Sequence, residues 1–180
     1  QSCFCINVGP ERSDNIRLRP EVGGGSLWDV GVYPVSFSVY LGGEKAPAEV
    51  YADGYLGETK VDIGFQGQLR FNGGFSSQIA CGFRQPETRL VRVFGDKGRI
   101  DCDEPWQPGW RGNPSRISIR STKGTEEQIE IPQKDPYLCE VEAMEDVVLD
   151  GKEPLLPLSL SREFLKTVLA LYRSAEEKRA

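Results

Sequence analysis

Hydrophobic and polar residues alternate along the middle of the chain, and this period of two predicts β-strands. The clearest run covers residues 59–71, and the turn Asn72-Gly73-Gly74 follows it directly. Alternation then resumes over residues 75–83, so the sequence predicts an antiparallel hairpin. The apolar positions of the first run are Thr59, Val61, Ile63, Phe65, Leu69 and Phe71, and the polar positions between them are Lys60, Asp62, Gln66, Gln68 and Arg70.

Shorter runs of the same kind predict further strands on both sides of this hairpin. They cover residues 48–55, 89–94, 99–102, 116–121 and 128–131, and Gly95-Asp96-Lys97-Gly98 is the turn between the second and the third. Strands joined by short turns form a mainly antiparallel sheet, and such a sheet commonly buries only one face. The polar row of the hairpin, together with Gln78, should lie on the open face.

Apolar residues at helical spacing predict three helices that flank the strands, over residues 27–41, 138–149 and 158–178. The first begins after Gly23-Gly24-Gly25, with Ser26 placed as N-cap and Asp29 in a capping-box position. Pro34 should kink it, because proline removes a backbone donor from the helix. We therefore expect an α+β fold, a largely antiparallel, open-faced sheet with helices packed on one face.

Length and charge limit the classes of protein to consider. The chain has 180 residues, enough for one domain, with 22 basic and 27 acidic side chains and a net charge of −5. It has no apolar run near the ~18 residues of a membrane helix and no basic run, which argues against a membrane or nucleic-acid partner. No cluster of metal ligands is visible in the sequence. The only methionine is Met144, so we expect the chain to be part of a longer protein.

The complete absence of histidine excludes several kinds of catalytic site. Serine and cysteine triads and the histidine-rich zinc motifs all need an imidazole, so any catalysis must use other groups. The five cysteines, Cys3, Cys5, Cys81, Cys102 and Cys139, are odd in number and lack C-x-x-C spacing. We interpret them as reduced structural thiols of a cytoplasmic protein.

Asp29 and Tyr33 form the candidate catalytic pair. Four residues apart on a helix, they would share one face, about 6 Å apart at Cβ. A carboxylate beside a phenol can act as general acid or base on a sugar alcohol or carbonyl, and a phenol is protonated near neutral pH. The alternative is structural, with Asp29 as a helix cap and Tyr33 as a core residue. The triple glycine does not fit the dinucleotide pattern G-x-G-x-x-G, because Trp28 occupies the sixth position.

The chain resembles the Gfo/Idh/MocA family, the glucose-fructose oxidoreductase and inositol dehydrogenase group. The resemblance starts at Asn15-Ile16-Arg17 and continues through the GGGxLxDxGxY pattern of residues 23–33. It extends over Pro34, Leu41-Gly42, the turn Gly95-Asp96-Lys97-Gly98 and the closing helices, and so covers nearly the whole chain.

The resemblance implies that residues 1–180 are a single substrate-binding and oligomerisation domain, similar to the C-terminal domain of glyceraldehyde-3-phosphate dehydrogenase. In such a two-domain oxidoreductase an N-terminal Rossmann domain, absent from this chain, binds NAD or NADP. Asp29 and Tyr33 match the family's aspartate and its acid/base position. Asn15 and Arg17 match residues near the entrance of the active site, so we expect them to bind substrate. The substrate would be a sugar, a polyol or a related carbonyl compound.

The family's catalytic lysine has no counterpart here, because Glu44-Lys45-Ala46-Pro47 matches neither its Glu-Lys-Pro motif nor its place. We therefore expect no turnover by the isolated chain, since hydride transfer needs cofactor and substrate in fixed contact. Two alternatives stay open, a non-enzymatic sugar-binding or assembly module with the same fold, and an unrelated α+β binding domain. The polar open face also predicts a homo-oligomer, with an ordinary solvated face as the alternative.

Overall fold

The computed structural model describes residues 1–9, 14–108 and 114–179. The protein has the expected α+β fold, with a mixed, mostly antiparallel sheet and flanking helices. It divides into two compact units, Gln1–Thr88 with Ser159–Ala180 and Arg89–Leu158. No helix of the described residues is both long enough and apolar enough to cross a membrane.

The first unit contains four strands in the order β2-β3-β4-β1. β2 (Glu49–Leu56), β3 (Asp62–Arg70) and β4 (Ser76–Gly82) are antiparallel neighbours, with the predicted turn between β3 and β4. β1 (Ser2–Asn7) was not predicted, and it pairs with β4 in parallel. Its sequence has little alternation because residues on both of its faces, Phe4 and Cys5 among them, are buried.

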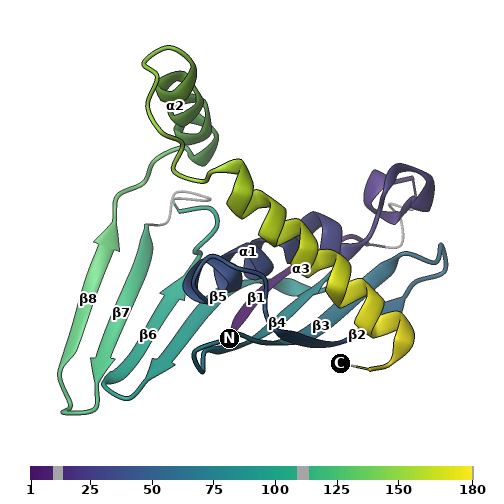
Figure 1. Ribbon diagram of the computed structural model, residues 1–180, viewed down its shortest axis with the longest axis horizontal. Coiled ribbons are helices and arrows are strands. Elements are labelled where there is room, and N and C mark those ends of the chain that lie inside the picture. Colours follow the sequence, from purple (N-terminus) through teal and green to yellow (C-terminus); the bar gives the residue numbers. More distant parts are fainter. Residues whose placement is uncertain (10–13, 109–113, 180) are drawn as a thin grey trace. The chain divides into compact units, whose positions relative to one another are not determined.

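Two helices cover one face of these strands. α1 (Val32–Leu41) contacts β1 and β4, and α3 (Leu158–Glu177) runs across the strands of this unit (Figure 1). The Ser174 hydroxyl of α3 accepts a hydrogen bond from Ala52 N of β2 at 3.1 Å. The core lies between these layers, whereas the glutamine and arginine side chains of the opposite face are exposed. Its most buried large side chains are Leu27, Val35, Val39, Leu69, Phe83, Val168 and Leu171.

The second unit is built from consecutive hairpins. β5 (Arg84–Gly95) starts just before the boundary between the units and pairs with β6 (Gly98–Asp103) around the predicted turn. β7 (Ser115–Ser121) and β8 (Glu126–Ile131) continue the antiparallel order. α2 (Pro136–Val148) follows, and Asp135 caps it by accepting from the backbone of Tyr137 and Leu138. The apolar stripe expected on this helix is present but exposed, since α2 has no buried residue.

The first predicted helix differs from the expected α-helix over residues 27–41. Residues Leu27–Gly31 form a π-helical turn, and only Val32–Leu41 is α-helical. Pro34 gives the physical reason, because proline cannot donate the α-helical hydrogen bond to Val30, four residues before it. The predicted cap is also wrong, since the Ser26 side chain does not cap the helix and Asp29 makes no capping box.

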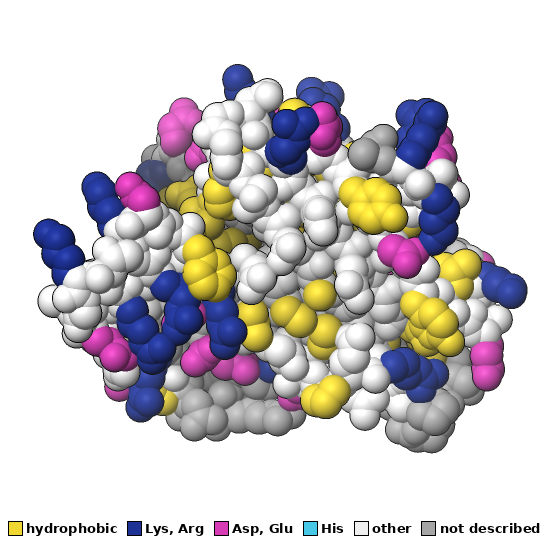
Figure 2. Space-filling view, turned by 90° about the horizontal axis from the view of Figure 1, so that it is seen from below, with side chains coloured by type: hydrophobic (Ala, Val, Ile, Leu, Met, Phe, Trp, Pro, Cys, Tyr) yellow, Lys and Arg dark blue, Asp and Glu magenta, His cyan; other side chains and the backbone are white. Residues whose placement is uncertain are grey.

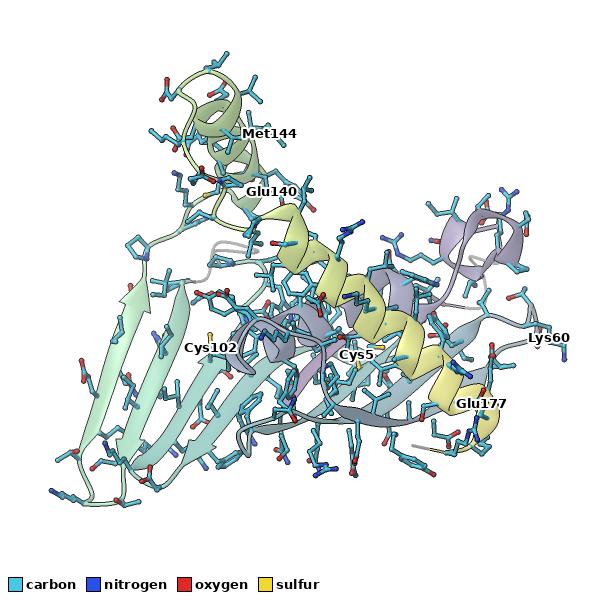
Figure 3. All side chains as sticks on the ribbon, in the orientation of Figure 1. Cys5, Lys60, Cys102, Glu140, Met144 and Glu177 are labelled. Atoms are coloured by element: carbon cyan, nitrogen blue, oxygen red, sulfur yellow. The ribbon has the colours of Figure 1, made fainter. Side chains whose placement is uncertain are left out.

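Asp62 does not lie in the polar row where the sequence placed it. Its side chain is 4% exposed, whereas Gln66, Gln68 and Arg70 on the same strand are exposed. The pairing of β2 with β3 shifts register between Tyr55 and Leu56, and such a bulge reverses the face on which the following residues point. Asp62 therefore faces the core, while Lys60 stays outside on the turn between β2 and β3 (Figure 3).

All five cysteines are free thiols, as predicted. Burial raises the pKa of Cys81, which lies under the helical layer. Cys3 and Cys5 lie next to each other on β1 with their sulfur atoms 3.4 Å apart (Cys5 in Figure 3). The hydrogen bond between them lowers the pKa of Cys3 and raises that of Cys5.

Candidate functional site

The three consecutive glycines fold the chain tightly against its own preceding turn. Gly23 ends a short 3-10 helix, Pro20–Val22, with a positive φ of 77°. The backbone N–H of Gly25 donates to the carbonyl oxygen of Arg17 at 2.9 Å. A Cβ atom on Gly24 would lie 2.6 Å from that same oxygen, so a larger residue could not approach as closely. The glycine turn therefore brings the start of the helical segment beside Arg17.

Three of the four residues predicted for the site are joined by hydrogen bonds. Arg17 Nε donates to Asp29 Oδ2 at 2.5 Å, and both side chains are partly exposed, at 38% and 28%. Asn15 caps the short 3-10 helix Ile16–Leu18, because its Oδ1 accepts from Arg17 N at 3.0 Å. Asn15 thus fixes the backbone that carries Arg17, and Arg17 fixes the carboxylate of Asp29.

Tyr33, the fourth predicted residue, lies on the first turn of α1. Its side chain is 40% exposed, and its ring lies 5.1 Å from the ring of buried Phe4 on β1. The ring is therefore supported by the core while part of the side chain reaches solvent. Asp29 lies in the preceding π-helical turn, so the two residues belong to two successive helical segments and not to one continuous α-helix.

A small cavity of about 220 Å³ opens at the charged pair. Its walls include Arg17, Asp29, Trp28 and the glycine turn. A larger cavity of about 510 Å³ shares Gly23, Gly24 and Trp28 with it and extends to Lys60, Asp62 and Tyr172. Trp28 therefore borders two neighbouring spaces, and each of them is lined by charged as well as apolar residues.

Asp62 forms a buried hydrogen-bonded cluster behind the glycine turn, and no pattern in the sequence indicated it. Its Oδ2 accepts from the Ser26 hydroxyl at 2.6 Å and from Leu27 N at 2.8 Å. Its Oδ1 accepts from the Tyr172 hydroxyl of α3 at 2.7 Å. Burial, together with the neighbouring Asp62 carboxyl, raises the pKa of Tyr172. The hydroxyl therefore stays protonated and acts as a donor.

The glycine turn does not have the setting of a dinucleotide-binding loop. Such a loop joins a buried strand to an α-helix whose N-terminal N–H groups face the pyrophosphate. Here a 3-10 helix precedes the glycines. The backbone N–H of Leu27 already donates a hydrogen bond to the Asp62 side chain. These residues therefore do not form a cradle for the phosphates of NAD or NADP.

The acidic residues near the end of β6 pair with arginines. Asp101 accepts from Arg99 Nε at 2.9 Å, and Glu104 pairs with Arg89 at 3.3 Å. Within the described ranges 1–9, 14–108 and 114–179, no group of three or more potential ligands could hold a metal ion.

Several known proteins resemble this chain over most of its length. A D-xylose 1-dehydrogenase (NADP(+)) from Haloferax volcanii is 32% identical over 174 residues, which cover 93% of this chain and 50% of that protein. A dTDP-3,4-didehydro-2,6-dideoxy-alpha-D-glucose 3-reductase from Streptomyces violaceoruber is 30% identical over 79% of this chain and 42% of that protein. The chain spans about half the length of these curated relatives or less.

A solved structure shares the fold, and a family description matches the sequence. The 3-ketoreductase from Actinomadura kijaniata, in complex with NADP and TDP-benzene, has a TM-score of 0.79 at 23% identity. The match covers 96% of this chain and 52% of that one. Residues 1–101 match the GFO/IDH/MocA C-terminal domain. The chain therefore belongs to the GFO/IDH/MocA family and corresponds to its C-terminal domain.

Proposed function

We propose that this chain is the substrate-binding and catalytic C-terminal half of an NAD(P)-dependent oxidoreductase that acts on a sugar, a polyol or a related carbonyl compound. The observation that carries the proposal is the partly exposed Arg17–Asp29 pair beside a cavity, one turn before Tyr33. The names of the relatives point in the same direction, since they include a xylose dehydrogenase and ketosugar reductases. We call the longer protein to which this half would belong the parent protein.

Tyr33 is proposed to exchange the proton of the reacting hydroxyl or carbonyl group. Its phenol would donate the proton in reduction and its phenolate would accept one in oxidation, and the chain has no histidine for that role. The contact with Phe4 limits the motion of the ring, so the hydroxyl is presented from a fixed position.

Asp29 and Arg17 are proposed to bind and orient the substrate hydroxyl groups. Sugar hydroxyls both donate and accept hydrogen bonds. The Asp29 carboxylate offers an acceptor and the neighbouring Arg17 guanidinium offers donors at the same place. Asn15 has a supporting part, because it holds the backbone of Arg17.

The nicotinamide cofactor would accept or donate the hydride, and we propose that the rest of the parent protein binds most of it. The name of the Haloferax volcanii relative favours NADP over NAD. The glycine turn of this chain is already occupied by the Asp62 side chain. The isolated chain is therefore proposed to lack turnover. We also propose a reducing compartment such as the cytoplasm for the protein, because its five cysteines are free thiols.

A direct assay tests this function. We expect the parent protein to reduce NADP⁺ or NAD⁺ with at least one aldose or polyol from a panel that includes D-xylose, measured by absorbance at the nicotinamide band. The isolated 180-residue chain should give no signal under the same conditions. A parent protein that binds sugars without any hydride transfer would favour the non-enzymatic binding module.

We also propose that the exposed face of the strands in the first unit forms a homo-oligomer. Gln66, Gln68, Arg70 and Gln78 make this face polar. On the face drawn in Figure 2, hydrophobic side chains lie in separate small groups among polar and charged ones. An interface of this composition relies on hydrogen bonds as well as on apolar contacts.

Light scattering after size exclusion tests the oligomer. The parent protein should elute as a dimer or larger assembly at micromolar concentration. Gln68→Glu, which adds a negative charge to the exposed face, should shift the mass toward the monomer. The matched control is Glu58→Gln on the turn outside β3. A parent protein that is monomeric at all concentrations would contradict the proposal.

A further inference from the structure

The buried cluster around Asp62 lies directly behind the candidate site, although none of its polar groups belongs to the predicted set. It joins three segments that are far apart in sequence, the glycine turn, the start of β3 and the C-terminal half of α3. Asp62 is 4% exposed and Ser26 is fully buried. The hydrogen bonds from Ser26 and Leu27 are therefore shielded from water, whereas the bond from Tyr172 is partly buried at the wall of the larger cavity.

The cluster touches the residues from which the site is built. A Cβ on Gly25 would lie 2.4 Å from Asp62 Oδ1 and 3.1 Å from the Tyr172 hydroxyl. Ser26 follows Gly25, and its hydroxyl donates a hydrogen bond to Asp62. The backbone N–H of Leu27, the next residue, donates to the same carboxyl group. Trp28 and Asp29 follow at once, so the backbone that carries them is anchored at two successive residues.

The aromatic ring of Tyr172 adds a second link to the same segment. It lies 5.8 Å from the ring of Trp28 and 5.5 Å from the ring of Phe65 on β3. Asp29 N in turn donates to the carbonyl oxygen of Gly25 at 3.1 Å. A shift of Tyr172 would therefore move the Trp28 wall of both cavities and the turn that holds Asp29.

We propose that Asp62 and Tyr172 are positioning residues that hold the Gly25–Leu27 backbone, so that α3 sets the placement of Asp29 and Trp28 in the site. Burying a carboxyl group costs desolvation free energy. If stability alone were required, apolar residues of similar size would join the three segments at a lower free-energy cost. A fully satisfied polar network instead fixes one geometry, which a site for a small polar substrate requires.

This inference rests on the proposed oxidoreductase function, so its test uses the parent protein and reads turnover. Tyr172→Phe keeps the ring contacts and removes only the hydroxyl that donates a hydrogen bond to Asp62. We expect kcat to fall about 10-fold to 100-fold, with a smaller change in KM, because misplacement of catalytic groups by a fraction of an ångström has effects of this size. The matched control is Tyr40→Phe on α1, a tyrosine that is 52% exposed, which should leave both constants unchanged.

A double-mutant cycle separates positioning from a general loss of structure. If Tyr172 acts through the segment that carries Asp29, its effect should shrink to about 2-fold or less in an Asp29→Asn background. An equal fold-change in both backgrounds, or a kcat of Tyr172→Phe equal to that of the wild type, would overturn the proposal. If Tyr172→Phe does not fold, Ser26→Ala removes one donor from the same carboxyl and is judged by the same criterion.

The outcomes also separate this inference from the proposed function. A wild-type parent protein without hydride transfer on any sugar or polyol overturns both. A wild-type protein that turns over, with a Tyr172→Phe variant of unchanged kcat, overturns the positioning role alone.

Discussion

Replacing Tyr33 by phenylalanine in the parent protein should lower kcat by about 10²- to 10⁴-fold, the usual contribution of a positioned general acid or base. The substitution removes one oxygen atom and keeps the ring that contacts Phe4, so the folded structure should persist. KM should change little, because the hydroxyl acts mainly on the proton that moves in the transition state. Steady-state kinetics together with circular dichroism measures both parts.

Tyr40→Phe is the matched control for this experiment. Tyr40 lies on the same helix α1 and is 52% exposed, so its hydroxyl should be dispensable. If Tyr33→Phe and Tyr40→Phe both keep wild-type turnover, Tyr33 has no acid/base role.

Replacing Gly25 by alanine should destabilise the chain by about 3 kcal/mol, through two effects that each cost about 1–3 kcal/mol. Gly25 has a φ of 132°, which residues with a side chain rarely adopt. Its new methyl group would also overlap the Asp62 carboxyl, at 2.4 Å from Oδ1. Urea unfolding of the chain, followed by tryptophan fluorescence, gives the change in the free energy of unfolding.

Gly74→Ala isolates the contribution of backbone conformation. Gly74 also has a positive φ, 88°, but a Cβ there would meet nothing within 4 Å. Its substitution should cost about 1 kcal/mol, from the backbone conformation alone. Equal losses for Gly25→Ala and Gly74→Ala would mean that the Asp62 cluster yields to an added methyl group and is not rigid.

Local patterns predicted those parts of the fold that depend on neighbours in sequence. The hairpin around Asn72-Gly73-Gly74 and the turn of residues 95–98 follow from alternation and turn residues, and the structure has both. β1 was missed because its partner β4 is distant in sequence and both of its faces are buried. The face predicted for Asp62 was wrong because a bulge reverses which residues of β3 point to the core. Such a bulge leaves no clear mark in the alternation of the sequence.

The sequence predicted only part of the candidate site. Spacing selected Asp29 and Tyr33, whereas the resemblance to a family added Asn15 and Arg17. Neither could indicate that Arg17 pairs with Asp29, because the glycine turn that brings them together depends on close backbone contacts. Tyr172 lies within the helix predicted over residues 158–178, but nothing in that pattern indicated its hydrogen bond to the Asp62 carboxyl, 110 residues earlier.

The discontinuous first unit constrains the order in which the protein can fold during synthesis. Its α3 belongs with residues Gln1–Thr88, yet the ribosome makes it only after the whole of Arg89–Leu158. The hairpins of the second unit join close neighbours and can form as they emerge, whereas the sheet of the first unit must wait for its covering helix. The apolar residues beneath α3, Phe65 among them, stay uncovered until α3 itself has left the ribosome. A nascent chain arrested before residue 159 should therefore depend on chaperones far more than a chain that already includes α3.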